Sequence, residues 1–233
     1  MARTLIVGDV HGCSRELADL LDQAAFGADD RLVLVGDLVA RGPDSAGVLA
    51  LARRAGALGV RGNHELRLLE ARAARLRGER GPRLGPSQEA LLGELTDEDW
   101  AQLEALPLWL ELDEHEARVV HAGLVPGVPV EEQDPWVLTR IRGFEDDGAP
   151  TSKLRAKSWA ERWRGSPHVV FGHNAIAGLQ LHSHATGLDT GCVYGGRLTA
   201  LVLPHGARVP RKADRADALV SVRARRVYAP LGE

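Results

Sequence analysis

Three short apolar runs near the amino terminus each end in a glycine that is followed by a polar residue able to bind a ligand. They end in GDVHG at residues 8–12, GD at 36–37 and GNHE at 62–65. Runs of this length are typical of buried strands, and helical patterns at 13–25 and 44–55 separate them. Alternating strands and helices predict a parallel sheet, and the carboxyl ends of its strands form a common site. We therefore expect these polar residues to converge.

The rest of the chain divides into a helical part and a part rich in strands. The first strands are expected at 4–7, 32–35 and 58–61. Residues 66–106 have helical character, are interrupted at 78–82 and restart at the capping sequence TDED of 96–99, so we interpret them as a helical insertion in one domain spanning 1–233. The later expectations are strands at 108–112, 118–121, 168–171, 179–188 and 198–203, an edge hairpin at 218–228, and helices at 135–142 and 154–163.

Charge and cysteine content narrow the range of partners and compartments. The 29 basic and 32 acidic residues give a net charge of -3, which argues against a polyanion binder that relies on a global positive field. Two cysteines are too few for a disulfide framework or a thiolate zinc site. No apolar run approaches the length of a membrane span, and Asp9 interrupts the apolar start. We expect a cytoplasmic protein that binds neither DNA nor membranes.

Two later histidines occur in the same setting, at the ends of apolar runs. They are His121 in VHAG and His173 in FGHN. Asp9 and His11 are two residues apart, which places both side chains on one side of an extended segment. Any one of these residues alone is more often a helix cap or an ordinary hydrogen-bonded side chain. Their repetition at strand ends predicts a shared site, and mixed carboxylate, amide and imidazole ligands suit Mn, Fe, Co or Zn.

Five ordered blocks resemble the signature of a known family. The blocks are DVHG at 9–12, GDLVARG at 36–42, GNHE at 62–65, HAG at 121–123 and GH at 172–173. They resemble those of the calcineurin-like metallophosphoesterases, in the phosphoprotein phosphatase branch. Segments 36–43 and 188–201 are most similar to bacterial symmetrical diadenosine tetraphosphate hydrolases. The resemblance implies a four-layer α/β/β/α sandwich, with the helical insertion over the cleft, and cleavage of diadenosine tetraphosphate into two ADP.

The resemblance also implies two divalent metal ions that share one bridging carboxylate, that of Asp37. One ion would be bound by Asp9, His11 and Asp37. The ligands of the other would be Asp37, Asn63, His121 and His173. Manganese is the expected metal, and cobalt, iron or zinc are the alternatives.

Further roles follow from the same resemblance. His64 is expected to protonate the leaving group, and Arg41 is expected to bind the phosphoryl oxygens. A second family arginine falls within 138–142, where we prefer Arg142, although the sequence does not separate it from Arg140. Trp136 precedes this pair and is our candidate for stacking against adenine.

Two departures from related patterns bear on the substrate. Ala175 stands where the broader phosphodiesterases carry a second histidine, which favours the phosphoprotein phosphatase branch. Ala40 stands where protein phosphatases carry an aspartate that orients the general-acid histidine. Its absence favours phosphoanhydride cleavage, because a diphosphate leaving group is a weak base and needs little protonation. The same chemistry could remove a dinucleoside-polyphosphate cap from RNA.

Two rival functions remain open at this point. The first is a serine/threonine protein phosphatase that uses the same metal centre. The second is a nucleotide-binding protein that descends from an enzyme but has no catalytic activity. The second rival predicts decayed ligands, whereas all six candidate ligand positions match the family pattern. The sequence gives no indication of the oligomeric state.

Overall fold

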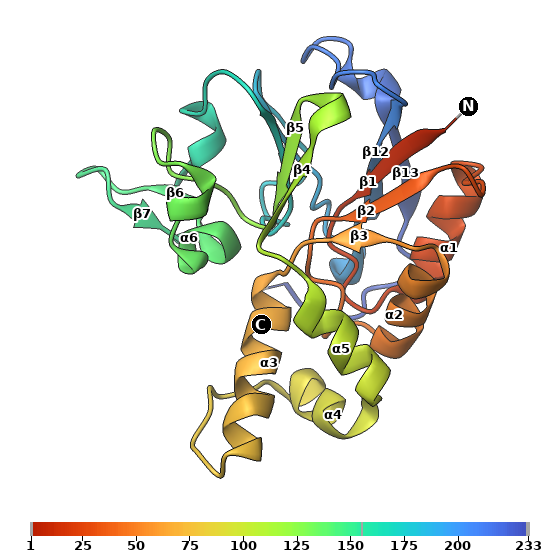
Figure 1. Ribbon diagram of the computed structural model, residues 1–233, viewed down its shortest axis with the longest axis vertical. Helices are drawn as coiled ribbons and strands as arrows, with labels where there is room; N and C mark the ends of the chain where they lie inside the picture. The colour runs from red at the N-terminus through yellow and green to blue at the C-terminus, as the bar shows by residue number, and fades with distance from the viewer. Residues whose placement is uncertain (1, 155, 232–233) are drawn as a thin grey trace.

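The structure is a computed structural model that describes residues 2–154 and 156–231. Two five-stranded sheets lie face to face, and helices cover their outer faces (Figure 1). The core between the sheets combines side chains from both, such as Ile6 and Val33 from one and Val119 and Val170 from the other. Together with the helices on each side, this arrangement confirms the α/β/β/α sandwich.

In the first sheet four strands run in one direction and one runs against them. Its order is β13 (Leu219–Arg223), β12 (Arg197–Pro204), β1 (Arg3–Val7), β2 (Arg31–Leu34) and β3 (Leu58–Gly59). The strands β1, β2 and β3 are parallel, as the alternation of strands and helices predicts. However, β12 runs antiparallel to both β1 and β13, so the sheet as a whole is mixed.

The second sheet is also mixed but has a different arrangement. Its order is β10 (Gln180–Leu181), β11 (Ala185–Gly187), β9 (His168–Phe171), β5 (Ala117–Val120) and β4 (Trp109–Leu112). The three central strands are parallel and the two edge strands are antiparallel. A small third sheet consists of β7 (Pro150–Thr151), β6 (Gly143–Phe144) and β8 (Lys157–Ser158).

Burial on both faces explains why the last three residues of β1 are apolar rather than alternating. Leu5 and Val7 face α1 (Ser14–Gln23) and α2 (Ser45–Arg54), whereas Ile6 points into the core between the sheets. A strand covered on both sides needs apolar residues at every position. The outer face of the second sheet is covered by α6 (Pro135–Arg140).

Three helices follow β3 and lie below the two sheets in Figure 1. They are α3 (Asn63–Leu76), α4 (Pro86–Glu94) and α5 (Asp97–Ala105). The hydroxyl of Thr96 accepts a hydrogen bond from the Asp99 N–H, which caps α5 where the sequence indicates a helix start. The short 3-10 turns are η1 (Asp113–His115), η2 (Val130–Glu132), η3 (Trp159–Glu161), η4 (Cys192–Tyr194) and η5 (Arg215–Ala218).

Two local predictions are wrong. The helix expected over 154–163 is strand β8 followed by the turn η3, with residue 155 outside the described part. Tertiary contacts override the local pattern, because buried Trp159 donates a hydrogen bond to the Ala122 carbonyl and packs against Phe171. The edge hairpin expected at 218–228 is the single strand β13, paired with β12. No helix in the described residues is long and apolar enough to cross a membrane.

Candidate metal centre

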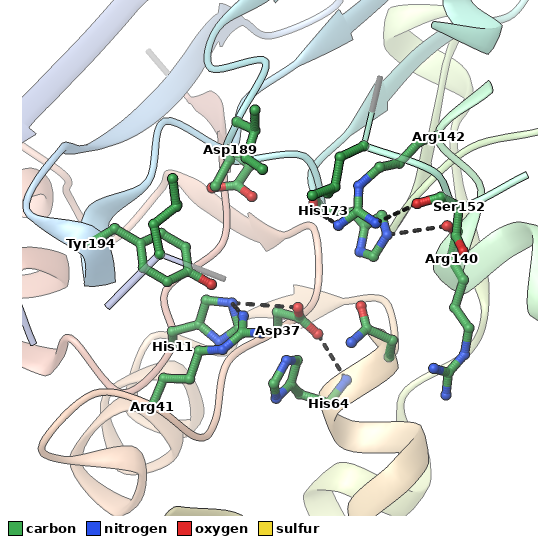
Figure 2. Close-up of a pocket in the computed structure, with 15 residues that line it drawn as sticks. His11, Asp37, Arg41, His64, Arg140, Arg142, Ser152, His173, Asp189 and Tyr194 are labelled. Carbon is green, nitrogen blue, oxygen red and sulfur yellow. Dashed lines mark hydrogen bonds and ion pairs between the residues drawn. The ribbon is translucent and has the colours of Figure 1, made fainter. Parts of the chain in front are cut away.

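The polar residues that follow the strands of both sheets meet in one place. Asp9 and Asp37 follow β1 and β2, and Asn63 begins α3. From the second sheet, His121 follows β5 and His173 follows β9. Figure 2 shows side chains from both sheets turned toward a common cavity. The sandwich therefore brings together residues that lie more than 160 positions apart, such as Asp9 and His173.

Asp37 lies at the centre of this group. Its Oδ2 is 3.5 Å from His11 Nε2 and 3.4 Å from His121 Nε2. Two sets of possible ligand atoms, each within 4.8 Å of one another, share this carboxylate: one set comprises His11, Asp37 and His64, and the other Asp37, His121 and His173. A shared carboxylate between two clusters is what the family resemblance implies for Asp37.

Asp9 and His64 occupy places that differ from the expectation. Both carboxylate oxygens of Asp9 lie 3.1 Å from the backbone nitrogen of His173, which donates to them. Asp9 is absent from the two clusters, and His64 completes the one with His11. Asn63 lies beside the second cluster, with its Oδ1 3.1 Å from His121 Nε2. All six predicted ligands converge, and their role as ligands stays a prediction.

Backbone carbonyls orient the imidazole rings. Val39 O lies 3.2 Å from His11 Nδ1, and Val35 O lies 2.9 Å from His121 Nδ1. A carbonyl can only accept, so each Nδ1 carries a hydrogen and each Nε2 faces Asp37. His173 is held the other way round, because its Nε2 lies 3.2 Å from Arg140 O. Such outer contacts are typical of metal-binding histidines, whose free nitrogen they point at the ion.

The protonation of the site also fits a cation. Burial lowers the pKa of His11 to about 4 and that of His173 well below its usual value, so both rings are neutral and each has one unprotonated nitrogen. Burial disfavours charge on His121 and Asp37 too, but their mutual attraction outweighs it. The pKa of His121 therefore rises to about 10, and that of Asp37 falls well below its usual range. A bound cation would replace the proton on His121.

Buried acids elsewhere in the site have the opposite shift. Burial and then the charge of Asp189 raise the pKa of Asp9 well above its usual value. Burial likewise raises the pKa of Asp189 to about 6. Closely spaced buried carboxyl groups disfavour one another's negative charge unless a positive group lies between them. The buried carboxyl groups of this site therefore favour a positive ion between them, which fits a site for divalent ions.

Glu65 supports the site, and sequence reasoning gave it no role. Its side chain is fully buried and accepts four backbone hydrogen bonds. Oε2 accepts from Asp37 N at 2.9 Å and Gly62 N at 2.8 Å, and Oε1 accepts from Leu38 N at 2.8 Å and Val39 N at 3.2 Å. This carboxylate joins the loop after β2 to the start of α3. The only sequence signal was its place in the GNHE block.

The glycines of the motifs serve two purposes. Gly36 has a φ of 97°, a left-handed conformation that favours glycine. Gly62 and Gly172 are needed for close packing instead. A Cβ at Gly62 would lie 2.2 Å from Asp37 Oδ1, and one at Gly172 would lie 1.9 Å from Asp9 Oδ1. Backbone conformation thus explains Gly36, and close packing explains Gly62 and Gly172.

A cavity of about 310 Å³ opens above the clusters. Its described lining residues are His11, Asp37, Arg41, Asn63, His64, Arg140, Arg142, Ser152, Leu154, His173, Ala175, Ile176, Asp189, Tyr194 and Leu231. The predicted His64 and all three predicted arginines are among them. Trp136 is not, and its side chain is 37% exposed on α6.

The arginines approach the cavity from different sides (Figure 2). Arg41 Nη1 lies 3.1 Å from His11 Nε2, and its guanidinium lies 5.5 Å from the ring centre of Tyr194. Arg142 donates from Nη1 to Ser152 O at 2.9 Å and from Nη2 to His173 O at 3.5 Å. The two carbonyls fix Arg142, whereas for Arg140 the contact with His173 is made by its backbone carbonyl. Both arginines line the cavity, so the structure does not select one of them.

Sequence reasoning missed the apolar side of the cavity. Leu154 and Ile176 are 52% and 51% exposed, and Leu231 near the carboxyl end is 59% exposed. Tyr194 adds its ring from η4, in a block that resembles the tetraphosphate hydrolases. These residues come from four distant segments and carry no common motif. Only the fold brings them together.

Comparison with known proteins gives a consistent assignment. A model of the calcineurin-like phosphoesterases matches residues 2–208. A symmetrical bis(5'-nucleosyl)-tetraphosphatase of Nitrosomonas europaea is 32% identical, over 86% of this chain and 94% of that protein. Serine/threonine-protein phosphatase 1 of Salmonella typhimurium is 33% identical, over 83% and 88%. Some other relatives are named asymmetrical tetraphosphatases.

A solved structure supports the same grouping. It is that of a proposed diadenosine tetraphosphatase, which is 38% identical in sequence and superposes with a TM-score of 0.82. The match covers 95% of this chain and 93% of that one. The similarity therefore extends over nearly the whole chain.

Proposed function

Because the chain belongs to the calcineurin-like phosphoesterases, we propose that it is a metal-dependent hydrolase that splits diadenosine tetraphosphate into two ADP. The observation that carries this proposal is the pair of ligand clusters around Asp37, at the base of a cavity lined by three arginines. The relatives named symmetrical tetraphosphatases support the choice of substrate.

We infer that the cavity floor holds two divalent ions, with manganese preferred over cobalt, iron or zinc. The ligands would be Asp9, His11, Asp37, Asn63, His121 and His173. When bound, the ions would supply Lewis acidity and a nucleophile at neutral pH. The neutral rings of His11 and His173 and the ionised carboxylate of Asp37 suit this role.

Arginines meet the charge of the tetraphosphate. Arg41 approaches from the side of His11, and Arg142 is fixed on the opposite side by its two carbonyl contacts. Positioned guanidinium groups stabilise the charge on the phosphoryl oxygens without having to reorganise. The protein's net charge is -3, so this attraction is local rather than global. The apolar side, with Leu154, Ile176 and Tyr194, would receive a nucleoside.

His64 would assist departure of the leaving group. Burial lowers the pKa of His64 to about 3, so its ring is neutral at neutral pH and offers a hydrogen bond rather than a full positive charge. A neutral donor suffices for an ADP leaving group, because the second pKa of a phosphate is roughly 6. A serine alkoxide is far more basic and would need complete protonation.

The products of turnover test this proposal. The purified protein is incubated with Mn²⁺ and diadenosine tetraphosphate, and the nucleotides are separated by ion-exchange chromatography. Two ADP per substrate support symmetrical cleavage. ATP with AMP would place the chain with its asymmetrical relatives instead. Binding of the dinucleotide without turnover by any divalent ion would favour the nucleotide-binding alternative.

The protein phosphatase is the second candidate function, because a relative with that name is 33% identical. A phosphoserine peptide assayed beside the dinucleotide separates the two. A larger kcat/KM on the peptide would overturn our choice. RNA with a dinucleoside-polyphosphate cap has the same reacting anhydride, and we propose it as an additional substrate. Release of a diphosphate end from such RNA would support this extension.

A further inference from the structure

The Nδ1 nitrogen of His64 is contacted by the side-chain amide of Gln88, a residue of the helical insertion. Gln88 lies in the first turn of α4, and its Nε2 is 3.4 Å from His64 Nδ1. Gln88 is 5% exposed, so this polar side chain is buried against the site. Ala40 has no polar side chain to offer to His64. A buried amide therefore contacts the imidazole that the proposed function assigns to the leaving group.

We propose that Gln88 is a positioning residue that orients His64 by donating an amide hydrogen bond to Nδ1. An amide nitrogen can only donate, so Nδ1 accepts and the ring hydrogen resides on Nε2. His64 and Asp37 belong to the same ligand cluster, and Nε2 is the nitrogen left to face it. The inference rests on the proposed function, because it gives the N–H of His64 a task in catalysis.

The neighbouring residue of α4 holds the other catalytic candidate. Ser87 Oγ accepts a hydrogen bond from the backbone nitrogen of Arg41 at 3.2 Å. This backbone needs support, because Ala40 and Arg41 have φ angles of 71° and 68° in the left-handed region. Consecutive residues in one helical turn thus contact the segments that present His64 and Arg41. The insertion therefore contacts the segments that carry the site, although none of its residues 66–106 is among the described lining residues of the cavity.

The neutrality of the amide has a consequence for the substrate. A carboxylate partner would stabilise a positively charged imidazole and so favour full proton transfer to a basic leaving group. An amide fixes the direction of the ring but adds no negative charge. Gln88 thereby suits a leaving group that is a weak base, such as a nucleoside diphosphate. This arrangement distinguishes the chain from an enzyme that must release an alkoxide.

Nitrogen NMR of the unmodified protein tests the contact directly. The protein is loaded with Zn²⁺, which is diamagnetic, and the His64 signals are assigned by their loss in His64→Asn. We expect Nδ1 to have the shift of an unprotonated ring nitrogen and Nε2 that of a protonated one. A hydrogen on Nδ1 would overturn the proposal. In Gln88→Glu, the carboxylate can only accept, so the hydrogen should move to Nδ1.

Kinetics test the consequence for catalysis. Gln88→Met keeps the length and burial of the side chain but removes its donor, and Glu89→Ala is the control, since Glu89 is exposed on the same helix and pairs with Arg75. General acid catalysis contributes roughly 100-fold or more, so loss of orientation should cost about tenfold in kcat/KM. This loss should be at least several-fold greater for phenyl phosphate than for p-nitrophenyl phosphate, whose leaving group is a weaker base.

The outcomes separate this inference from the proposed function. An equal loss on both aryl phosphates, or no loss compared with Glu89→Ala, would show that Gln88 does not act through His64. If neither aryl phosphate is turned over, the NMR result alone decides. Absence of diadenosine tetraphosphate hydrolysis with every divalent ion would defeat the proposed function. It would leave the Nδ1 contact intact.

Discussion

Replacement of Glu65 by glutamine tests how the site is held together. In Glu65→Gln, one carboxylate oxygen becomes an NH₂ group and can no longer accept. In the unmodified protein each oxygen of Glu65 accepts two backbone N–H groups. In the variant, two of these buried donors would face the new NH₂ group, which is itself a donor. A buried donor left without a partner costs roughly 1–3 kcal/mol. The expected loss in the free energy of unfolding is therefore roughly 2–6 kcal/mol.

The assay is urea unfolding at pH 8, followed by circular dichroism. Glu70→Gln is the matched control, because Glu70 lies on the same helix α3 and is exposed. The control should change the free energy of unfolding by no more than about 0.5 kcal/mol. A typical domain has only about 5–15 kcal/mol in total, so the Glu65 variant should unfold at a clearly lower urea concentration.

An opposing effect makes this a strict test. Burial, followed by the charge of Asp37, raises the pKa of Glu65 to about 7. A carboxyl group whose pKa is raised by folding stabilises the folded state at pH values below its pKa in the unfolded chain. This stabilisation is lost as the pH rises through the pKa in the folded state, and above that pKa the buried charge is unfavourable. If this cost outweighed the four hydrogen bonds, Glu65→Gln would be as stable as the wild type at pH 8, or more stable. That result would refute the claim that the Glu65 carboxylate holds the loop after β2 against the start of α3.

Other predictions concern the metal and the packing around it. Asp37→Ala should abolish both metal uptake, measured by atomic emission, and turnover, because both clusters lose their shared carboxylate; unchanged activity would contradict the ligand assignment. Gly172→Ala should destabilise the fold by about 1–3 kcal/mol in urea unfolding, since its Cβ would collide with Asp9, whereas a neutral result would mean that the loop can move. Manganese should displace the proton from His121, whose pKa is about 10. The affinity of the protein for Mn²⁺, measured by titration calorimetry, should therefore rise by about tenfold per pH unit between pH 6 and 8. A pH-independent affinity would argue against His121 as a ligand.

The sequence predicted the parts of the fold that depend on local pattern. The runs at β1, β2, β5 and β9 are apolar because both faces are covered, and a glycine with a polar residue follows β1, β2 and β9. The convergence of Asp9 and Asp37 followed from the rule that parallel strands present their carboxyl ends together, and His173 was grouped with them because it also follows an apolar run. These features could be recognised because each is encoded within a few consecutive residues.

Other features depend on contacts between distant segments and had no local signal. Trp159 and Trp163 have helical spacing, yet Trp159 is fixed by the Ala122 carbonyl and the chain forms β8 and η3 instead. The apolar side of the cavity combines Leu154, Ile176 and Tyr194, which share no motif. The contact between Gln88 and His64 spans 24 positions and depends on how α4 packs against α3.

The most direct test of the central claim is to locate the metal by anomalous diffraction. Crystals grown with Mn²⁺ are measured on both sides of the manganese absorption edge. We predict two anomalous peaks per chain, both within contact distance of Asp37 and adjoining the cavity that contains His11 and His173. The absence of peaks, or peaks only at sites remote from Asp37, would contradict the claim that these side chains form one two-metal centre.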